Sequence, residues 1–177
     1  NTLQGESLGT TAAKWHGTDA LALFATNTFL ADLNGDGRVD VVRTGSESLS
    51  VRWNRATCAG APATQTPCLN AAVNRPAVDG VALLPGPNAR FHEVNGDGLA
   101  DVVQLLTGSY KVFLGKGDGT FAAAGSFAYP WGDSTNTANV KLADLDRDGL
   151  MDLVHVLGGY VHWYRGKAGG GVEATAT

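Results

Sequence analysis

The chain has 177 residues, and its 24 glycines and six prolines leave little room for long helices. The net charge is −4 and the 13 lysines and arginines are dispersed, so the sequence has no basic stripe for a nucleic acid. No run approaches about 18 apolar residues, which predicts that nothing here spans a membrane. The length suits one domain, and a start at Asn1 without a signal peptide suits a mature chain or a domain of a longer protein.

A short strand is expected at residues 28–30, and an acidic loop comes directly after it. The loop reads Asp32-Leu33-Asn34-Gly35-Asp36-Gly37-Arg38-Val39-Asp40, with oxygen-bearing side chains at positions 1, 3, 5 and 9. Every-other-residue spacing in a tight turn aims several oxygens inward, and Ca²⁺ takes about six to eight oxygen ligands. The pattern therefore predicts a calcium site formed by the side chains of Asp32, Asn34, Asp36 and Asp40 and the backbone carbonyl of Arg38. Glycine at position 6 permits the positive φ that a sharp turn needs.

A polar, proline-containing insertion is expected at residues 58–79, and it holds the two cysteines, Cys58 and Cys68. A disulfide between them is predicted, because closing a loop of this size stabilises a fold by roughly 2–3 kcal/mol. The alternative is a pair of free thiols in a reducing cytoplasm. A disulfide and weak calcium loops, with Kd of about 10⁻⁴–10⁻³ M, both favour a secreted or cell-surface location.

The acidic pattern occurs twice more, and its copies start 61 and then 51 residues apart. The second set of predicted ligands is Glu93, Asn95, Asp97, Leu99 and Asp101, and the third is Asp144, Asp146, Asp148, Leu150 and Asp152. Of the 17 acidic residues, three, three and four lie in the successive loops. Clustered like charges repel one another without a cation, which favours up to three Ca²⁺ ions over the alternative of plain turns. Glu93 is one methylene longer than aspartate, so we expect the weakest binding at the second loop and the tightest at the third.

The residues after each loop exclude an EF-hand. An EF-hand closes with a bidentate glutamate at position 12 and is flanked by helices. Position 12 is Arg43, Gln104 or His155 here, and each loop leads into a short run rich in valine or leucine. Such runs predict strands.

The same order of strand, loop, strand, turn and aromatic strand recurs in three units. We place them at about residues 21–57, 80–124 and 125–166, with a tail at residues 167–177 that reads as a linker or an unfinished strand. Three antiparallel strands and a less certain fourth fit an all-β propeller blade. About four to eight blades close a propeller, so three predict part of a larger or assembled one. The remaining blades would come from the same longer chain or from another copy.

These residues resemble the FG-GAP and VCBS repeats of integrin α-like propellers. Gly115-Lys116-Gly117-Asp118-Gly119-Thr120-Phe121 resembles the turn that closes a VCBS unit, and residues 140–166 are similar to repeats of SpvB-like and Rhs-associated toxin complexes. The resemblance covers roughly half of the chain. It implies calcium-bearing blades, which occur in adhesins, lectins, toxins and accessory domains of enzymes, and it does not specify an activity.

The sequence offers little catalytic chemistry. His16, His92, His155 and His162 have no cysteine or acid at metal spacing, and no G-x-S-x-G or phosphate-loop motif is present. The expected function is therefore a non-catalytic scaffold or binding module, with a protein or glycan ligand. A carbohydrate-binding lectin is one alternative, in which the exposed Trp131 would stack on sugar while most other aromatics fill the core. A shell or accessory segment of an enzyme or toxin complex is the other.

Overall fold

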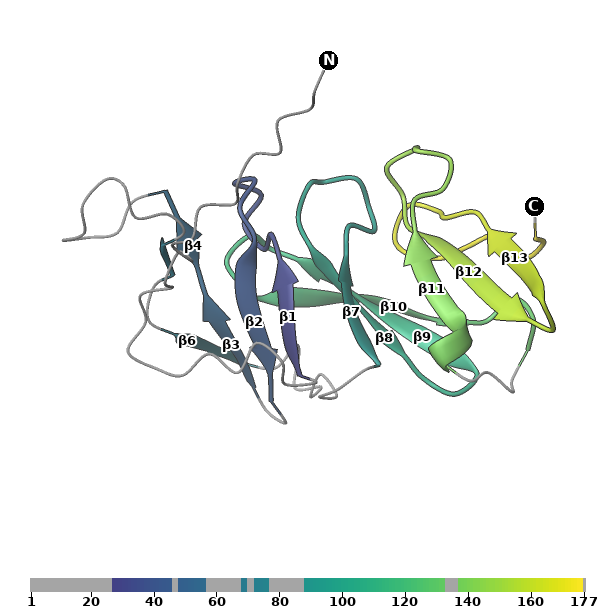
Figure 1. The fold of residues 1–177 in the computed structure, drawn as a ribbon, viewed down its shortest axis with the longest axis horizontal. Helices are drawn as coiled ribbons and strands as arrows, with labels where there is room; N and C mark the ends of the chain where they lie inside the picture. Colours follow the sequence, from purple (N-terminus) through teal and green to yellow (C-terminus); the bar gives the residue numbers. More distant parts are fainter. Residues whose placement is uncertain are drawn as a thin grey trace, which may run out of the picture.

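The computed structural model describes residues 27–45, 48–56, 68–69, 72–76, 88–132 and 137–176, and all structural statements concern these residues. Their strands form three antiparallel sheets that lie side by side along the long axis of the molecule (Figure 1). Within these residues, no helix is long and apolar enough to cross a membrane.

The first sheet has four strands in chain order: β1 (Thr28–Ala31), β2 (Asp40–Thr44), β3 (Ser48–Arg52) and β6 (Val73–Pro76). A separate two-stranded ribbon pairs β4 (Asn54–Arg55) with β5 (Cys68–Leu69). The expected insertion at residues 58–79 therefore supplies the fourth strand of the first sheet. Val73–Pro76 is four residues long and has one β-branched residue, so it is too short to be recognised as a strand without its partner β3. Cys58 lies outside the described residues, so the disulfide stays a prediction.

The second sheet is a complete four-stranded meander in the order β7 (Ala89–His92), β8 (Asp101–Leu105), β9 (Ser109–Gly115) and β10 (Phe121–Ala128). The register of β9 and β10 shifts between Ala123 and Gly125, which marks a β-bulge. The predicted end of the second unit at residue 124 falls inside β10, because the strand continues past this bulge.

The third sheet comes after a single 3₁₀ turn, η1 (Thr137–Asn139), and has the strands β11 (Val140–Ala143), β12 (Asp152–Leu157) and β13 (Tyr160–Tyr164). The residues after β13 repeat the turn between β9 and β10. Lys167 N donates to Gly171 O at 2.8 Å, as Lys116 N does to Thr120 O at 3.0 Å, and Gly166 forms a β-bridge with Val172. The predicted tail thus begins as a fourth strand would.

Two apolar cores lie between neighbouring sheets. Because successive side chains on a strand point to opposite faces, Val102 and Val103 of β8 belong to different cores. The core between the first two sheets buries Ala31, Leu33, Val42, Leu49, Val51, Trp53, Val102, Phe113 and Phe121. The core between the second and third sheets buries Val94, Val103, Leu105, Tyr110, Val112, Tyr129, Val140, Met151, Leu153 and Tyr164.

The far face of the third sheet is exposed at the β12–β13 hairpin. The register pairs Val156 with Val161, which are 39% and 66% exposed. The equivalent pair of the second sheet, Leu105 and Tyr110, is fully buried against the third sheet. The described residues therefore contain an apolar sheet face of the same kind, without a sheet packed on it.

Candidate calcium loops and a pocket between two sheets

The three acidic loops lie at the same end of the three sheets, and each connects the first strand of its sheet to the second (Figure 1). Their sixth-position glycines, Gly37, Gly98 and Gly149, have φ of 78°, 81° and 83°. This left-handed conformation is open to glycine at little cost and confirms the expected turn. At all three glycines, no atom lies within 4 Å of an added Cβ, so the backbone conformation alone requires glycine.

The ninth-position aspartates are fully buried, and they hold the loops to the sheets. In the second loop, Asp101 accepts hydrogen bonds from the N–H groups of Val94 at 2.9 Å and Gly115 at 2.7 Å. Asp40 and Asp152 accept the equivalent pairs, from residues seven before and 14 after them. Each carboxylate thus ties the start of its loop to the end of the third strand.

Burial raises the pKa of Asp101 to about 6, although its two backbone hydrogen bonds lower it and the charges of Asp97 and Glu93 raise it further. The pKa of Asp40 is also raised, again mainly by burial. A cation in the loop would lower the pKa of either aspartate, because it favours the ionised carboxylate.

In the first loop, the predicted side-chain ligands bind the loop backbone. Asp32 accepts hydrogen bonds from Gly35 N at 2.9 Å and Gly37 N at 2.8 Å. Asn34 accepts one from Asp36 N at 3.1 Å. These bonds hold the carboxylate and amide oxygens on the inside of the turn.

The predicted carbonyl ligands share one arrangement. The seventh residues, Arg38, Leu99 and Leu150, each donate their N–H to the fifth-position aspartate of the same loop, at 2.9, 2.8 and 2.9 Å. The three loops therefore turn in the same way at this point, despite their different side chains.

The second loop contains a buried acceptor without a partner. Glu93 Oε1 accepts hydrogen bonds from Asn95 N at 3.0 Å and Gly96 N at 2.7 Å. Its Oε2 is buried and has no hydrogen-bond partner within the described part of the chain. Leaving a carboxylate oxygen buried and unpaired is costly, and a bound cation would remove that cost.

The third loop brings its carboxylates closest to a metal-binding arrangement. Asp144, Asp146 and Asp152 each offer an oxygen, and these oxygens lie within 4.8 Å of one another. Two ligands of one Ca²⁺ lie at most about 5 Å apart, since each bond is roughly 2.3–2.6 Å long. The oxygen donors therefore fit calcium. Asp146 also forms an ion pair with Arg165, with an Nε–Oδ2 distance of 2.8 Å.

Trp131, the predicted sugar-binding residue, is half-buried between the second and third sheets. Its ring stacks on Tyr129, with centroids 4.8 Å apart, and on His155, with centroids 4.2 Å apart. His162 lies beyond His155, at a centroid distance of 6.4 Å. Trp131 thus contributes to packing between the sheets.

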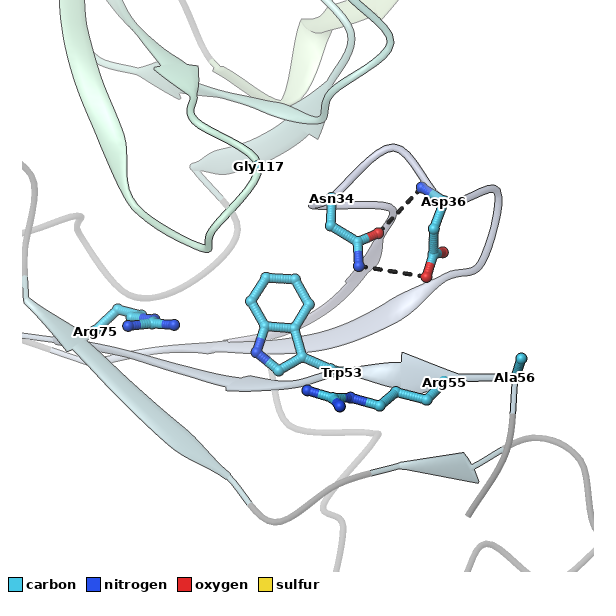
Figure 2. A pocket seen from close by; sticks show the side chains of 7 residues that line it. All are labelled: Asn34, Asp36, Trp53, Arg55, Ala56, Arg75 and Gly117. Carbon is cyan, nitrogen blue, oxygen red and sulfur yellow. Dashed lines mark hydrogen bonds between the residues drawn. The ribbon is translucent and has the colours of Figure 1, made fainter. Parts of the chain in front are cut away.

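A pocket of about 490 Å³ lies beside the first loop, where the first sheet meets the second. Its lining consists of Asn34, Asp36, Trp53, Arg55, Ala56, Arg75 and Gly117. Figure 2 shows the indole of Trp53 in the middle, with Arg75 on one side and Arg55 on the other. The sequence does not predict this pocket, because Arg75 belongs to the segment expected to be an insertion.

Residues 94–155 match the family model of the FG-GAP-like repeat. This part of the chain is similar to an FG-GAP-like repeat. The match includes most of the second acidic loop, the whole third loop and the strands between them. It confirms the resemblance that the sequence indicated for this part of the chain. A comparison with curated proteins found no match.

Solved structures share the fold. The Photorhabdus luminescens Tc holotoxin pore is 24% identical, with a TM-score of 0.64, over 87% of this chain and 7% of that chain. The TcdB2-TccC3 structure is 16% identical, with a TM-score of 0.60, over 78% of this chain and 6% of that chain. An Agrocybe aegerita lectin that recognises non-reducing terminal N-acetylglucosamine is 20% identical, with a TM-score of 0.58, over 85% of this chain and 37% of that chain.

At these identities the likeness establishes the fold. It confirms all-β propeller blades built from antiparallel sheets, and the three sheets formed by the described residues do not close into a ring. The match to this chain spans less than a tenth of each toxin chain and 37% of the lectin chain.

Proposed function

We propose that this chain is a calcium-stabilised β-propeller segment that works as a non-catalytic scaffold or binding module of a secreted, cell-surface or toxin protein. The main support is the third loop, where three carboxylate oxygens lie within 4.8 Å of one another inside an FG-GAP-like repeat. The buried, unpaired Oε2 of Glu93 supports a cation in the second loop independently.

Calcium would stabilise the contacts between neighbouring blades as well as each loop itself. A Cβ added to Gly35 in the first loop would lie 3.2 Å from Leu99 of the second, so the two loops are in close contact. A Cβ added to Gly96 in the second loop would lie 3.7 Å from the carbonyl oxygen of Gly149 in the third, which is an ordinary van der Waals contact. A loop stiffened by an ion would therefore hold its neighbour in place.

Further blades are the partners that the exposed face of the third sheet fits best. Val156 and Val161 occupy the positions that Leu105 and Tyr110 use to pack on a following sheet. Apolar area buried there would stabilise the contact by roughly 25 cal/mol per Å². The blade that covers this face would belong to the same longer chain or to a second copy, within a toxin complex or another extracellular assembly.

Carbohydrate binding is the second candidate function. Its support is the likeness to the Agrocybe aegerita lectin, together with a pocket that contains an indole and hydrogen-bonding side chains. Aromatic rings stack on the apolar face of a sugar while polar neighbours bind its hydroxyl groups.

The calcium proposal is tested by thermal unfolding in excess calcium and in excess chelator. One site with free calcium at 100 times its Kd adds about 2.7 kcal/mol to the free energy of unfolding. Asp146→Asn should lose a large part of the calcium-dependent shift in Tm, because it removes a ligand of the third loop. Glu173→Gln, which removes a carboxylate outside the loops, should keep the full shift. An identical Tm of the parent chain in calcium and chelator would contradict the proposal.

A further inference from the structure

We propose that the pocket between the first and second sheets binds a carboxylated sugar ring, with Arg55 and Arg75 holding the carboxylate and Trp53 facing the ring. The inference names a ligand class for the binding module and rests on that part of the proposed function, whereas the calcium proposal is independent of it. It starts from the side chains that line the pocket.

Trp53 supplies a fixed apolar surface. It comes directly after β3 and is 9% exposed, and its exposed part lines the pocket. Gly119 of the second sheet holds the ring from the other side, since an added Cβ there would lie 3.2 Å from Trp53 Cζ2. An indole locked in this way loses little conformational entropy when a ring settles against it.

Two guanidinium groups face the same pocket. Arg75 comes from β6 and Arg55 from β4, and the two side chains line the pocket on either side of Trp53 (Figure 2). Arg75 Nε is buried and has no hydrogen-bond partner among the residues that the structure describes. A guanidinium binds a carboxylate through two parallel hydrogen bonds, which a ligand could form here.

The acidic groups nearby already have partners. Asp36 accepts a hydrogen bond from the amide of Asn34 at 3.3 Å and pairs with Arg38 at 3.5 Å. Asp118 accepts hydrogen bonds from the backbone N–H and the hydroxyl of Thr120, and the charge of Arg75 is a minor cause of its lowered pKa. Calcium in the first loop would neutralise Asp36, which leaves the pocket with a positive charge. The Nδ2 group of Asn34 uses one of its two N–H bonds on Asp36, and the second could donate to a sugar hydroxyl.

The second sheet shows that the blade does not need an indole at the position of Trp53. The residues at the positions of Trp53 and Arg55, counted from the ninth-position aspartate, are Leu114 and Lys116. An aliphatic residue thus suffices to fill the equivalent contact between the second and third sheets. The indole is specific to the contact between the first two sheets, and so is Arg75, whose counterpart in the second sheet is Phe127. Lys116 keeps a basic side chain at the position of Arg55. The combination of the indole with Arg75 therefore points to a role in binding.

The test is a titration of the full chain in excess calcium, monitored by calorimetry or NMR, with three probes: glucuronate, glucose and acetate. Glucuronate should bind at least about tenfold more tightly than glucose, which lacks the carboxylate, and than acetate, which lacks the ring. Arg75→Gln and Arg55→Gln should each weaken glucuronate binding by about tenfold. Arg75→Lys keeps the charge but loses the fork, and it should weaken binding less than Arg75→Gln.

Arg43→Gln is the matched control, because Arg43 is exposed on the opposite face of the first sheet and should leave glucuronate binding unchanged. Unfolding curves of each variant show whether the fold is retained, and the lysine variant tests the pocket if glutamine disrupts it. Absence of glucuronate binding by the parent chain would overturn the inference, as would equal binding of glucose or acetate. A calcium-dependent shift in Tm that persists in such a chain would leave the calcium proposal intact.

Discussion

The backbone N–H of Ala100 donates a hydrogen bond of 3.0 Å to the carbonyl of Asp32, and this bond joins the second acidic loop to the first. Asp32 is position 1 of its loop, and Ala100 directly precedes Asp101, the last residue of the second. Any change in the first loop on binding calcium therefore acts on a residue next to a predicted ligand of the second.

Neighbouring loops should consequently bind calcium with coupling. Asp36→Asn, Asp97→Asn and the double variant form a double-mutant cycle for the first and second loops, read by calorimetric calcium titration. We expect non-additive losses of affinity, with a coupling of about 1 kcal/mol or more. Asp36→Asn combined with Asp148→Asn is the control, because the first and third loops are not adjacent and their effects should add. Additive losses in both cycles would contradict the coupling.

The buried ninth aspartate should matter for stability even without calcium. Asp101→Asn replaces one of two acceptor oxygens with an NH₂ group, which leaves Val94 N–H or Gly115 N–H unpaired. The expected loss is about 1–3 kcal/mol in the free energy of unfolding, measured by denaturant titration in chelator. Asp97→Asn, in the exposed part of the same loop, should be close to neutral in chelator and harmful only in calcium. Equal effects of both variants in chelator would show that Asp101 has no structural role.

The loops and strands of this protein could be predicted because each rests on a local pattern. Gly98 marks the turn, and the short run rich in valine and leucine after Asp101 marks a strand. The fourth strand of the first sheet could not be predicted, since Val73–Pro76 becomes a strand only by pairing with β3. The structural role of Asp101 could not be predicted either. Its partner Gly115 lies 14 residues away, and the group that donates the hydrogen bond is a backbone N–H, which almost every residue has. The same holds for the pocket, which depends on Arg75 meeting Trp53.

The third loop contains a strained residue that calcium binding does not require. Arg147 has a φ of 63°, in the position where the other loops have Gly35 and Gly96. A non-glycine residue in this left-handed conformation destabilises the folded state by about 1–2 kcal/mol. Glycine avoids this strain, but it loses more conformational entropy on folding, which offsets roughly 0.5–1 kcal/mol of the gain. Arg147→Gly should therefore raise the free energy of unfolding by about 0.5–1 kcal/mol. Gly96→Ala is the reciprocal control: it introduces a side chain at the same loop position and should lower the free energy of unfolding. A lower free energy of unfolding for Arg147→Gly than for the parent chain would contradict the strain at Arg147.

His155 should make the joint between the second and third sheets sensitive to acid. It is 5% exposed and stacks on Trp131, and burial lowers its pKa, with the charge of His162 as the lesser cause. The unfolded chain thus takes up a proton at a higher pH than the folded chain. Stability from the neutral ring is complete well above about pH 6.5 and falls as the pH drops below that value.

The measurement is the free energy of unfolding of the parent chain, His155→Phe and His162→Gln between about pH 7.5 and 5, on either side of the ordinary histidine pKa. Excess calcium keeps the loop carboxylates ionised. His155→Phe keeps a ring against Trp131 and should flatten the pH dependence, whereas His162→Gln removes only the smaller cause and should retain most of it. A pH profile of His155→Phe that parallels the parent would place the acid sensitivity elsewhere. Because both variants lie on neighbouring strands and face each other in the β12–β13 register, the difference between them isolates the buried ring from general changes to the hairpin.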